Sequence, residues 1–174
     1  SNYSIAVRKI DRKKIETYVP SVICEDYNSV VAADSIAFVD DCARPDYTVI
    51  CGFSITDGSL LGSQSVLGGT YTVYCSTENI ITAGFSDNYE TSVSRYAISN
   101  GKINLKAQGK IEGSLLNQFS IDEYKGNFRF VTTISREVKT FEDGDVSGYA
   151  IENSNALFVL NSELKQIGAI KNLA

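Results

Sequence analysis

The chain has 174 residues, of which 43% are hydrophobic and 21% charged, and its formal net charge at pH 7 is −5. This length and apolar content predict one domain with a sizeable core. A nucleic-acid partner and a helical membrane span are both excluded, because the sequence has neither a concentrated basic surface nor an apolar run of about 20 residues. Histidine is absent, which removes the usual general base, the serine-type triad and the commonest zinc ligand.

The first residues are expected to lie outside the folded domain. Ser1-Asn2 is typical of an expression-tag remnant, so residues 1–19 are interpreted as that remnant and a leading segment, and the chain as a piece of a longer protein. Over residues 20–174, Val, Ile, Thr, Tyr and Phe are frequent and long Leu/Ala/Glu/Lys blocks are absent. This composition favours strands over helices.

Three copies of a similar unit follow, at about residues 20–69, 70–113 and 114–174. Each copy ends in a strand, a turn and a second strand. In the first two copies the turns are Thr-Asp-Gly and Ser-Asn-Gly, which places Gly58 and Gly101 forty-three residues apart. Asp-Gly and Asn-Gly are strong hairpin formers because glycine accepts positive φ.

Another strand pair is expected before each of these hairpins. The predicted pairs are Val22–Cys24 with Ser35–Val39, Tyr71–Cys75 with Ile80–Phe85, and Gln118–Tyr124 with Phe128–Ile134. The third unit also contains an insertion, residues 135–154. A repeat of about 45 residues built from four antiparallel strands is typical of a β-propeller blade. The predicted fold is therefore all-β, a partial β-propeller of about three four-stranded antiparallel blades. A β-sandwich also has short strands but does not require such a repeat.

The four cysteines lie in the first half of the chain without a CxxC spacing, which argues against a zinc or redox site. Cys51 and Cys75 occur inside apolar strand patterns and are expected to be buried, inert thiols. Cys24 and Cys42 flank a candidate hairpin and would pair in an oxidising compartment.

One segment of the insertion carries the spacing of a calcium loop. Residues 141–149 contain Asp-x-Asp-x-Ser-Gly, in which alternate side chains of a tight turn converge their oxygens. Asp143, Asp145 and Ser147 would be ligands, together with the carbonyl of Tyr149. The alternative interpretation is a solvated acidic turn.

Two other groups of residues are candidate catalytic or binding residues. Adjacent acidic residues would have to converge from different strands to act as a glycosidase acid and nucleophile, and turn residues on a solvated surface explain them better; these are Glu25-Asp26, Asp40-Asp41, Asp122-Glu123 and Glu142-Asp143. Six tyrosines either line a carbohydrate or peptide groove or pack between blades: Tyr71, Tyr74, Tyr89, Tyr96, Tyr124 and Tyr149.

The second and third units resemble a known family. Residues 94–114 (SRYAISNGKINLKAQGKIEGS), 115–133 (LLNQFSIDEYKGNFRFVTT) and 154–174 (SNALFVLNSELKQIGAIKNLA) are similar to bacterial secreted proteins with a C-terminal β-propeller domain distantly related to WD-repeats. The resemblance covers residues 70–174 best. It implies a secreted or cell-surface protein and carries no catalytic motif.

Three functions are consistent with these features. The first is a non-enzymatic interaction module that binds a protein or a glycan, without catalytic or cofactor-binding residues. The second is a carboxylate-dependent hydrolase or lyase acting on envelope glycans, and the third is a purely structural module. Three blades are too few to close a ring, which typically needs about 4–8. The exposed faces of the end blades are therefore expected to drive self-association unless the termini cover them.

Overall fold

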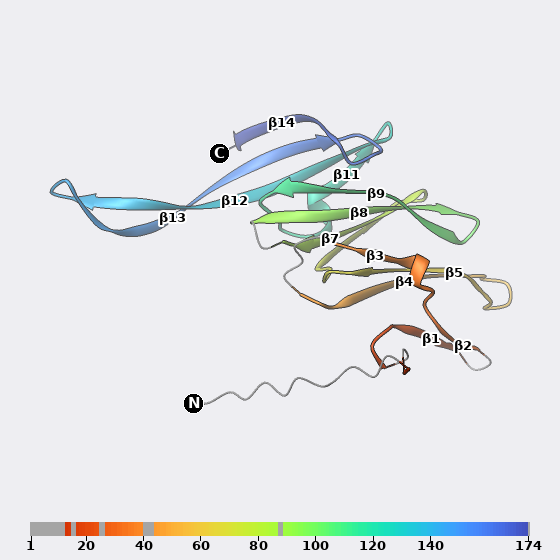
Figure 1. Ribbon diagram of the computed structural model, residues 1–174. Coiled ribbons are helices and arrows are strands. Elements are labelled where there is room, and N and C mark those ends of the chain that lie inside the picture. The colour runs from red at the N-terminus through yellow and green to blue at the C-terminus, as the bar shows by residue number, and fades with distance from the viewer. Residues whose placement is uncertain (1–12, 15–16, 25–26, 40–43, 87–88, 174) are drawn as a thin grey trace.

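A computed structural model describes residues 13–14, 17–24, 27–39, 44–86 and 89–173, and Figure 1 shows these residues as a stack of β-sheets. The helical elements among the described residues are single 3-10 turns such as Ala33–Ser35 (η2) and Gln118–Ser120 (η3). No helix in this part of the chain has the length and apolar character needed to cross a membrane. The predicted all-β, partial-propeller architecture is confirmed.

The middle sheet follows the predicted four-stranded antiparallel order. Its strands are β6 (Thr72–Cys75), β7 (Asn79–Phe85), β8 (Glu90–Ser99) and β9 (Lys102–Glu112), paired in the order β6-β7-β8-β9. The β8–β9 turn lies at Asn100-Gly101, where both residues have positive φ (50° and 73°). These angles are those of a tight hairpin turn, as the Asn-Gly pair predicts.

The last sheet contains a longer version of the same meander. β11 (Ile121–Tyr124), β12 (Asn127–Glu142), β13 (Asp145–Leu160) and β14 (Gln166–Leu173) pair in sequence, and the short β10 (Ser114–Leu115) pairs with β12 beside β11.

The first sheet differs from the prediction. It has three strands in the order β3-β5-β4, and β3 (Ile36–Phe38) runs parallel to β5 (Leu60–Leu67), which pairs antiparallel with β4 (Tyr47–Phe53). The predicted pairing of Val22–Cys24 with Ser35–Val39 is wrong, because β1 (Ser21–Cys24) forms a separate hairpin with β2 (Tyr27–Val30). The nearer partner closes a shorter loop, which costs less chain entropy.

The main core lies between the middle and last sheets. One face of β6–β9 contributes Ile81, Ala83, Val93 and Ile111, and the facing side of the last sheet contributes larger side chains, among them Ile121, Phe128, Phe130, Ile134, Phe158 and Leu160. Alternation along each strand places these residues on the buried side. The two sheets therefore stack face to face as neighbouring blades.

Neighbouring sheets also touch through backbone atoms at glycines. A Cβ at Gly109 in β9 would lie 2.7 Å from the carbonyl oxygen of Leu164 in the β13–β14 turn. A Cβ at Gly52 in β4 would lie 2.0 Å from the carbonyl oxygen of Gly101 in the β8–β9 turn. Only glycine allows backbone to approach backbone this closely.

The predicted insertion is a continuation of β12 and β13. Both strands are 16 residues long, and they remain paired from Phe128–Leu160 to Glu142–Asp145 at the tip. We call residues 135–142 and 145–154 the ribbon. Figure 1 shows it projecting well beyond the stacked sheets.

Candidate functional site

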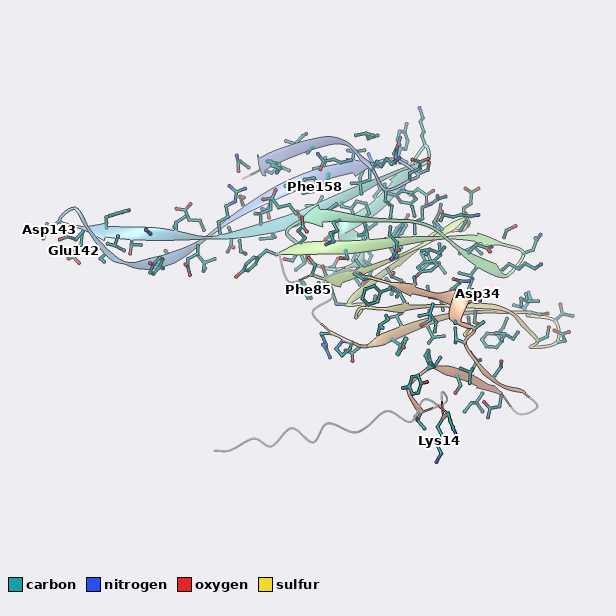
Figure 2. All side chains as sticks on the ribbon, viewed as in Figure 1. Lys14, Asp34, Phe85, Glu142, Asp143 and Phe158 are labelled. Atoms are coloured by element: carbon teal, nitrogen blue, oxygen red, sulfur yellow. The ribbon has the colours of Figure 1, made fainter. Side chains whose placement is uncertain are left out.

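The candidate site is the end of the sheet stack from which the ribbon projects, which we call the ribbon end. The connector from β5 to β6, the β7–β8 connection and the β9–β10 connection meet here. Figure 2 places Phe85 at this end of the sheets and Glu142 and Asp143 at the far tip of the ribbon. Connections between strands, rather than the strands themselves, commonly carry binding residues.

Two hollows lie side by side at the ribbon end and share Phe85 as a wall. The first has a volume of about 220 Å³ and is lined by residues that include Arg44, Asp46, Gly69 and Tyr71. The second has a volume of about 420 Å³, and its lining is Phe85, Ser86, Tyr89, Gly113, Ser114, Thr133 and Ser135. Thr133 lies just before the ribbon and Ser135 begins it, so the second hollow lies at the ribbon's root.

The aromatic wall between the hollows is held in place. The rings of Tyr71 and Phe85 stack with centroids 4.1 Å apart and an interplanar angle of 14°. The Tyr71 hydroxyl accepts a hydrogen bond from the Leu115 N–H at 3.1 Å and lies 3.1 Å from the Thr91 hydroxyl. The Thr91 hydroxyl donates in turn to the Gly113 carbonyl at 2.7 Å. The Tyr71 ring is held by stacking on Phe85 and by the hydrogen bonds of its hydroxyl, so the wall needs no rearrangement to receive a ligand.

Tyr89 stands at the mouth of the second hollow in an unusual conformation. Its φ is 56°, and 83% of its side chain surface is exposed. Positive φ is costly for a bulky residue and is retained where the surroundings enforce it. Here the Gly113 N–H donates to the Tyr89 carbonyl at 2.9 Å. The backbone thus presents a large aromatic side chain to solvent at the edge of a hollow.

The ribbon has one apolar face. The cross-strand pairs Phe141–Val146, Lys139–Tyr149 and Glu137–Ile151 all point to the same side, since residues two apart on a strand share a face. The four apolar members are exposed by 64%, 48%, 63% and 62% for Phe141, Val146, Tyr149 and Ile151. The ribbon therefore presents a line of solvent-exposed apolar side chains flanked by one cation and one anion.

The ribbon also has open edges. Among the described residues, no third strand pairs with the ribbon beyond Ser135 and Asn155, because β10 ends opposite Thr133 and β14 ends opposite Asn155. A two-stranded ribbon is marginally stable by itself, and its free edges can accept another strand. Both properties favour a partner on the ribbon.

Of the predicted calcium ligands, Asp143 lies in the turn at the ribbon tip, and Asp145, Ser147 and Tyr149 lie in the extended strand β13. Asp143 occupies the turn with φ 52°, Asp145 begins β13 opposite Glu142, and the Ser147 hydroxyl lies 3.2 Å from that of Thr140. Alternate residues of a strand are about 7 Å apart, so the four predicted ligands do not converge as they would in a loop. Calcium binding at this tip stays a prediction, to be checked by calorimetric titration.

The acidic pair Asp122-Glu123 makes structural contacts. Asp122 forms an ion pair with Arg129, and Glu123 accepts hydrogen bonds from the Ser76 hydroxyl at 2.9 Å and the Asn79 side-chain amide at 2.8 Å. The Glu123 contacts link the middle and last sheets. Glu25-Asp26 and Asp40-Asp41 lie outside the described residues.

The cysteine predictions are partly wrong. Cys75 is exposed and Cys51 is half-buried, so neither is the buried thiol that its apolar strand predicts. Cys75 lies on β6, an edge strand of the middle sheet. The predicted pairing of Cys24 with Cys42 falls outside the description, because Cys42 and the side chain of Cys24 are not described.

The six tyrosines have different environments. Tyr71 and Tyr89 line the hollows, Tyr149 lies on the ribbon's apolar face, and Tyr124 is exposed in β11. Tyr96 is fully buried, and burial raises its pKa. Desolvation, followed by the nearby Glu123 carboxylate, raises the pKa of Tyr74. Phe85 and Phe141 are site residues that the sequence did not predict. An aromatic residue at the end of a strand, just before a connection, could have indicated Phe85.

Comparison with known proteins gives one match. A family model described as a beta propeller domain matches residues 1–174. No curated protein and no solved structure matches the chain.

Proposed function

Because this chain belongs to the β-propeller domain family, we propose that it is a non-enzymatic interaction module whose ribbon end binds a partner protein. The observation that carries the proposal is the line of exposed apolar side chains on one face of the ribbon, from Phe141 and Val146 to Ile151. Aromatic side chains are enriched where proteins bind one another, and exposed apolar patches mark such surfaces.

The hollows and Tyr89 extend this binding surface to the root of the ribbon. A partner lying along the apolar face would reach the second hollow, where Phe85 and Tyr89 offer an aromatic anchor site. A central aromatic pocket with a polar rim is the usual arrangement of an energetic hot spot. A strand of the partner would also satisfy the open backbone edge of the ribbon by β-augmentation.

Two other functions are less well supported. A carboxylate-dependent hydrolase or lyase needs two carboxylates converging on a substrate. The first hollow offers one carboxylate, Asp46, which is ion-paired with Arg44 at 2.9 Å. A purely structural module does not account for the exposed apolar face. The extracytoplasmic, bacterial setting of the proposed module rests on the resemblance of residues 70–174 alone.

The test is photo-crosslinking in the producing cell. The crosslinking amino acid p-benzoylphenylalanine is placed at Tyr149, on the apolar face, or at Ala150, which is also exposed but points to the opposite face. We expect a discrete product with one other protein from position 149 and at least a tenfold weaker one from position 150. Equal labelling from both positions, no discrete product, or a product of two copies of this chain would each contradict the proposal.

A further inference from the structure

Two of the contacts between successive sheets repeat one arrangement, which we call the turn-on-glycine contact. In both, a hairpin-turn residue with positive φ directs its carbonyl oxygen at a glycine in the preceding sheet. Leu164 (φ 55°) meets Gly109 in this way, and Gly101 (φ 73°) meets Gly52. These two contacts have the same direction, with the turn of the later sheet on the glycine of the earlier one. A third close approach, at the ribbon end, has the opposite direction: Gly69 (φ 66°) in the β5–β6 connector directs its carbonyl oxygen at Gly84 in β7.

Within the described part of the chain, each end of the stack carries one half of this contact without the other half. Gly168 in β14 pairs with Val159 across the ladder, as Gly109 pairs with Val93, but the nearest heavy atom to a Cβ placed there is Val159 Cβ at 3.9 Å. Gly168 is thus an open counterpart of Gly109.

The unused turn is the one between β4 and β5. Gly58 has the same φ as Gly101, 73°, and a Cβ placed on it would meet nothing within 4 Å. Ile55 in the same turn is fully exposed. Figure 1 shows this turn on the same side of the stack as the β8–β9 and β13–β14 turns, opposite the ribbon.

The sheet faces around these two halves are apolar. On the last sheet, Val131 and Ile170 are exposed by 45% and 56%, and they lie on the face turned away from β6–β9 because their ladder neighbours point into the core. The last sheet therefore offers apolar surface to a sheet of matching type. On the first sheet, the residues that alternate with Gly52 along β4 face away from the middle sheet. Of these, Val49 and Phe53 are exposed, on the side of the stack where Figure 1 also shows the β1–β2 hairpin.

We infer that a second copy of this chain docks head to tail, with its β4–β5 turn seated on Gly168 of the first copy. The chain contains both halves of a contact that it already makes twice internally, so it is complementary to itself. Such an interface is heterologous, and it closes into a ring when the rotation allows.

The test measures molar mass in solution by light scattering and sedimentation over a range of protein concentrations. Wild type is expected to associate. Gly168→Val places a side chain where the carbonyl of the docking turn would lie, and Ile55→Glu puts a charge into that turn. Each substitution is expected to weaken association at least tenfold. Phe119→Glu is the matched control, because Phe119 is 86% exposed but belongs to neither half, and it is expected to associate like wild type. Circular dichroism checks that each variant is folded.

Mixing the two variants tests the direction of the contact. The Gly168→Val chain keeps a functional turn and the Ile55→Glu chain keeps an open glycine, so a mixture is expected to form pairs although each variant alone does not. Wild type that is monomeric at every concentration, variants that associate like wild type, or a mixture that stays monomeric would overturn the inference. These residues lie away from the ribbon, so the outcome is independent of the crosslinking at Tyr149.

Discussion

Glu112 connects three strands of two sheets through a single carboxylate. It ends β9, and it accepts hydrogen bonds from Lys171 in β14 at 2.5 Å and from Arg136 in β12 at 3.0 Å. The Lys171 hydrogen bond, followed by that from Arg136, lowers the pKa of Glu112 below its ordinary value of 4.5. A lowered pKa in the folded state means that the charged form stabilises the fold.

The pH dependence of stability should report this carboxylate. Its contribution is complete above pH 4.5 and is lost as the pH falls through the lowered pKa of the folded state. At pH 7 we expect Glu112→Gln to lower Tm by about 2–4 °C, the shift expected for about 1 kcal/mol from partly exposed ion pairs. The difference from wild type should shrink as the pH falls below 4.5, measured by thermal unfolding.

Glu137→Gln on the exposed ribbon is the control, and its Tm difference from wild type should be small at both ends of the pH range. A Glu112→Gln difference that stays constant from neutral to acid pH would contradict the assigned role.

At this scale the sequence predicted residues whose chemistry is local. Gly58 and Gly101 are turn residues with positive φ, as their Asp-Gly and Asn-Gly pairs indicate. Leu164 also has positive φ and was not predicted, since its turn has no Asp-Gly or Asn-Gly pair and is held by Asn161, whose side chain accepts hydrogen bonds from the Glu163 and Lys165 N–H groups. Likewise, Cys75 has an apolar strand pattern, but its exposure depends on which strand forms the sheet edge.

Among the elements, the ribbon separates most clearly from the rest of the fold. Phe128, Phe130 and Ile134 on β12 are buried, whereas the residues of the ribbon beyond Ser135 are exposed or half-buried. Arg136 and Glu152 face each other across the ladder at its root. The ribbon therefore contributes to the binding surface and little to the core.

Replacing residues 137–151 with Asn-Gly should leave the domain intact. Arg136 and Glu152 would then flank a two-residue hairpin turn, for which Asn-Gly is the favoured sequence. We expect a Tm within about 3 °C of wild type, since no fully buried side chain is removed. The variant should no longer co-purify with the partner that the wild-type crosslink at position 149 identifies. A cooperative loss of folding would show instead that the ribbon supports the core.

The sequence indicated an insertion at residues 135–154 but not its structure. These residues lie within the paired strands β12 and β13, and that pairing was not predicted. Without a core to cover, polar and apolar residues do not alternate strictly there, as in Gly148-Tyr149-Ala150-Ile151. The β1–β2 hairpin was missed for a related reason, since four-residue strands give little periodic signal.

Across the whole molecule, the middle and last sheets share one core. Phe158 is 1% exposed and lies in the same apolar cluster as Ile81 and Val93 of the opposite sheet. Arg95 joins the sheets a second time, donating to the Asn79 side chain at 2.8 Å and to the Ser162 carbonyl at 2.9 Å. Two sheets with a common core are expected to unfold together.

Phe158→Ala should therefore destabilise both sheets equally. We expect a loss of about 3–5 kcal/mol in the free energy of unfolding, typical of a buried phenylalanine. Amide hydrogen exchange should show the same loss of protection in β7 and in β12. Leu116→Ala, at an 85% exposed position, is the control and should change stability by less than about 0.5 kcal/mol. Protection that is lost in β12 and retained in β7 would indicate independently folding sheets.

The repeat predicted this stacking for residues 70–174, where the turns are regular. It did not predict the parallel β3–β5 pair, since a parallel partner leaves no turn signature between the strands. The hollows of the ribbon end were also beyond the sequence, because each combines residues from segments far apart in the chain, such as Tyr89 and Ser135.

Each of the three larger sheets contains a glycine that can accept the turn of the next sheet and a turn that can lie on the glycine of the previous one. Every unit therefore carries both parts of the same joint. Duplication of a unit would then lengthen the array without any redesign of its joints, and deletion would shorten it. Copy number in such a chain is free to vary, while the order and direction of the units are not.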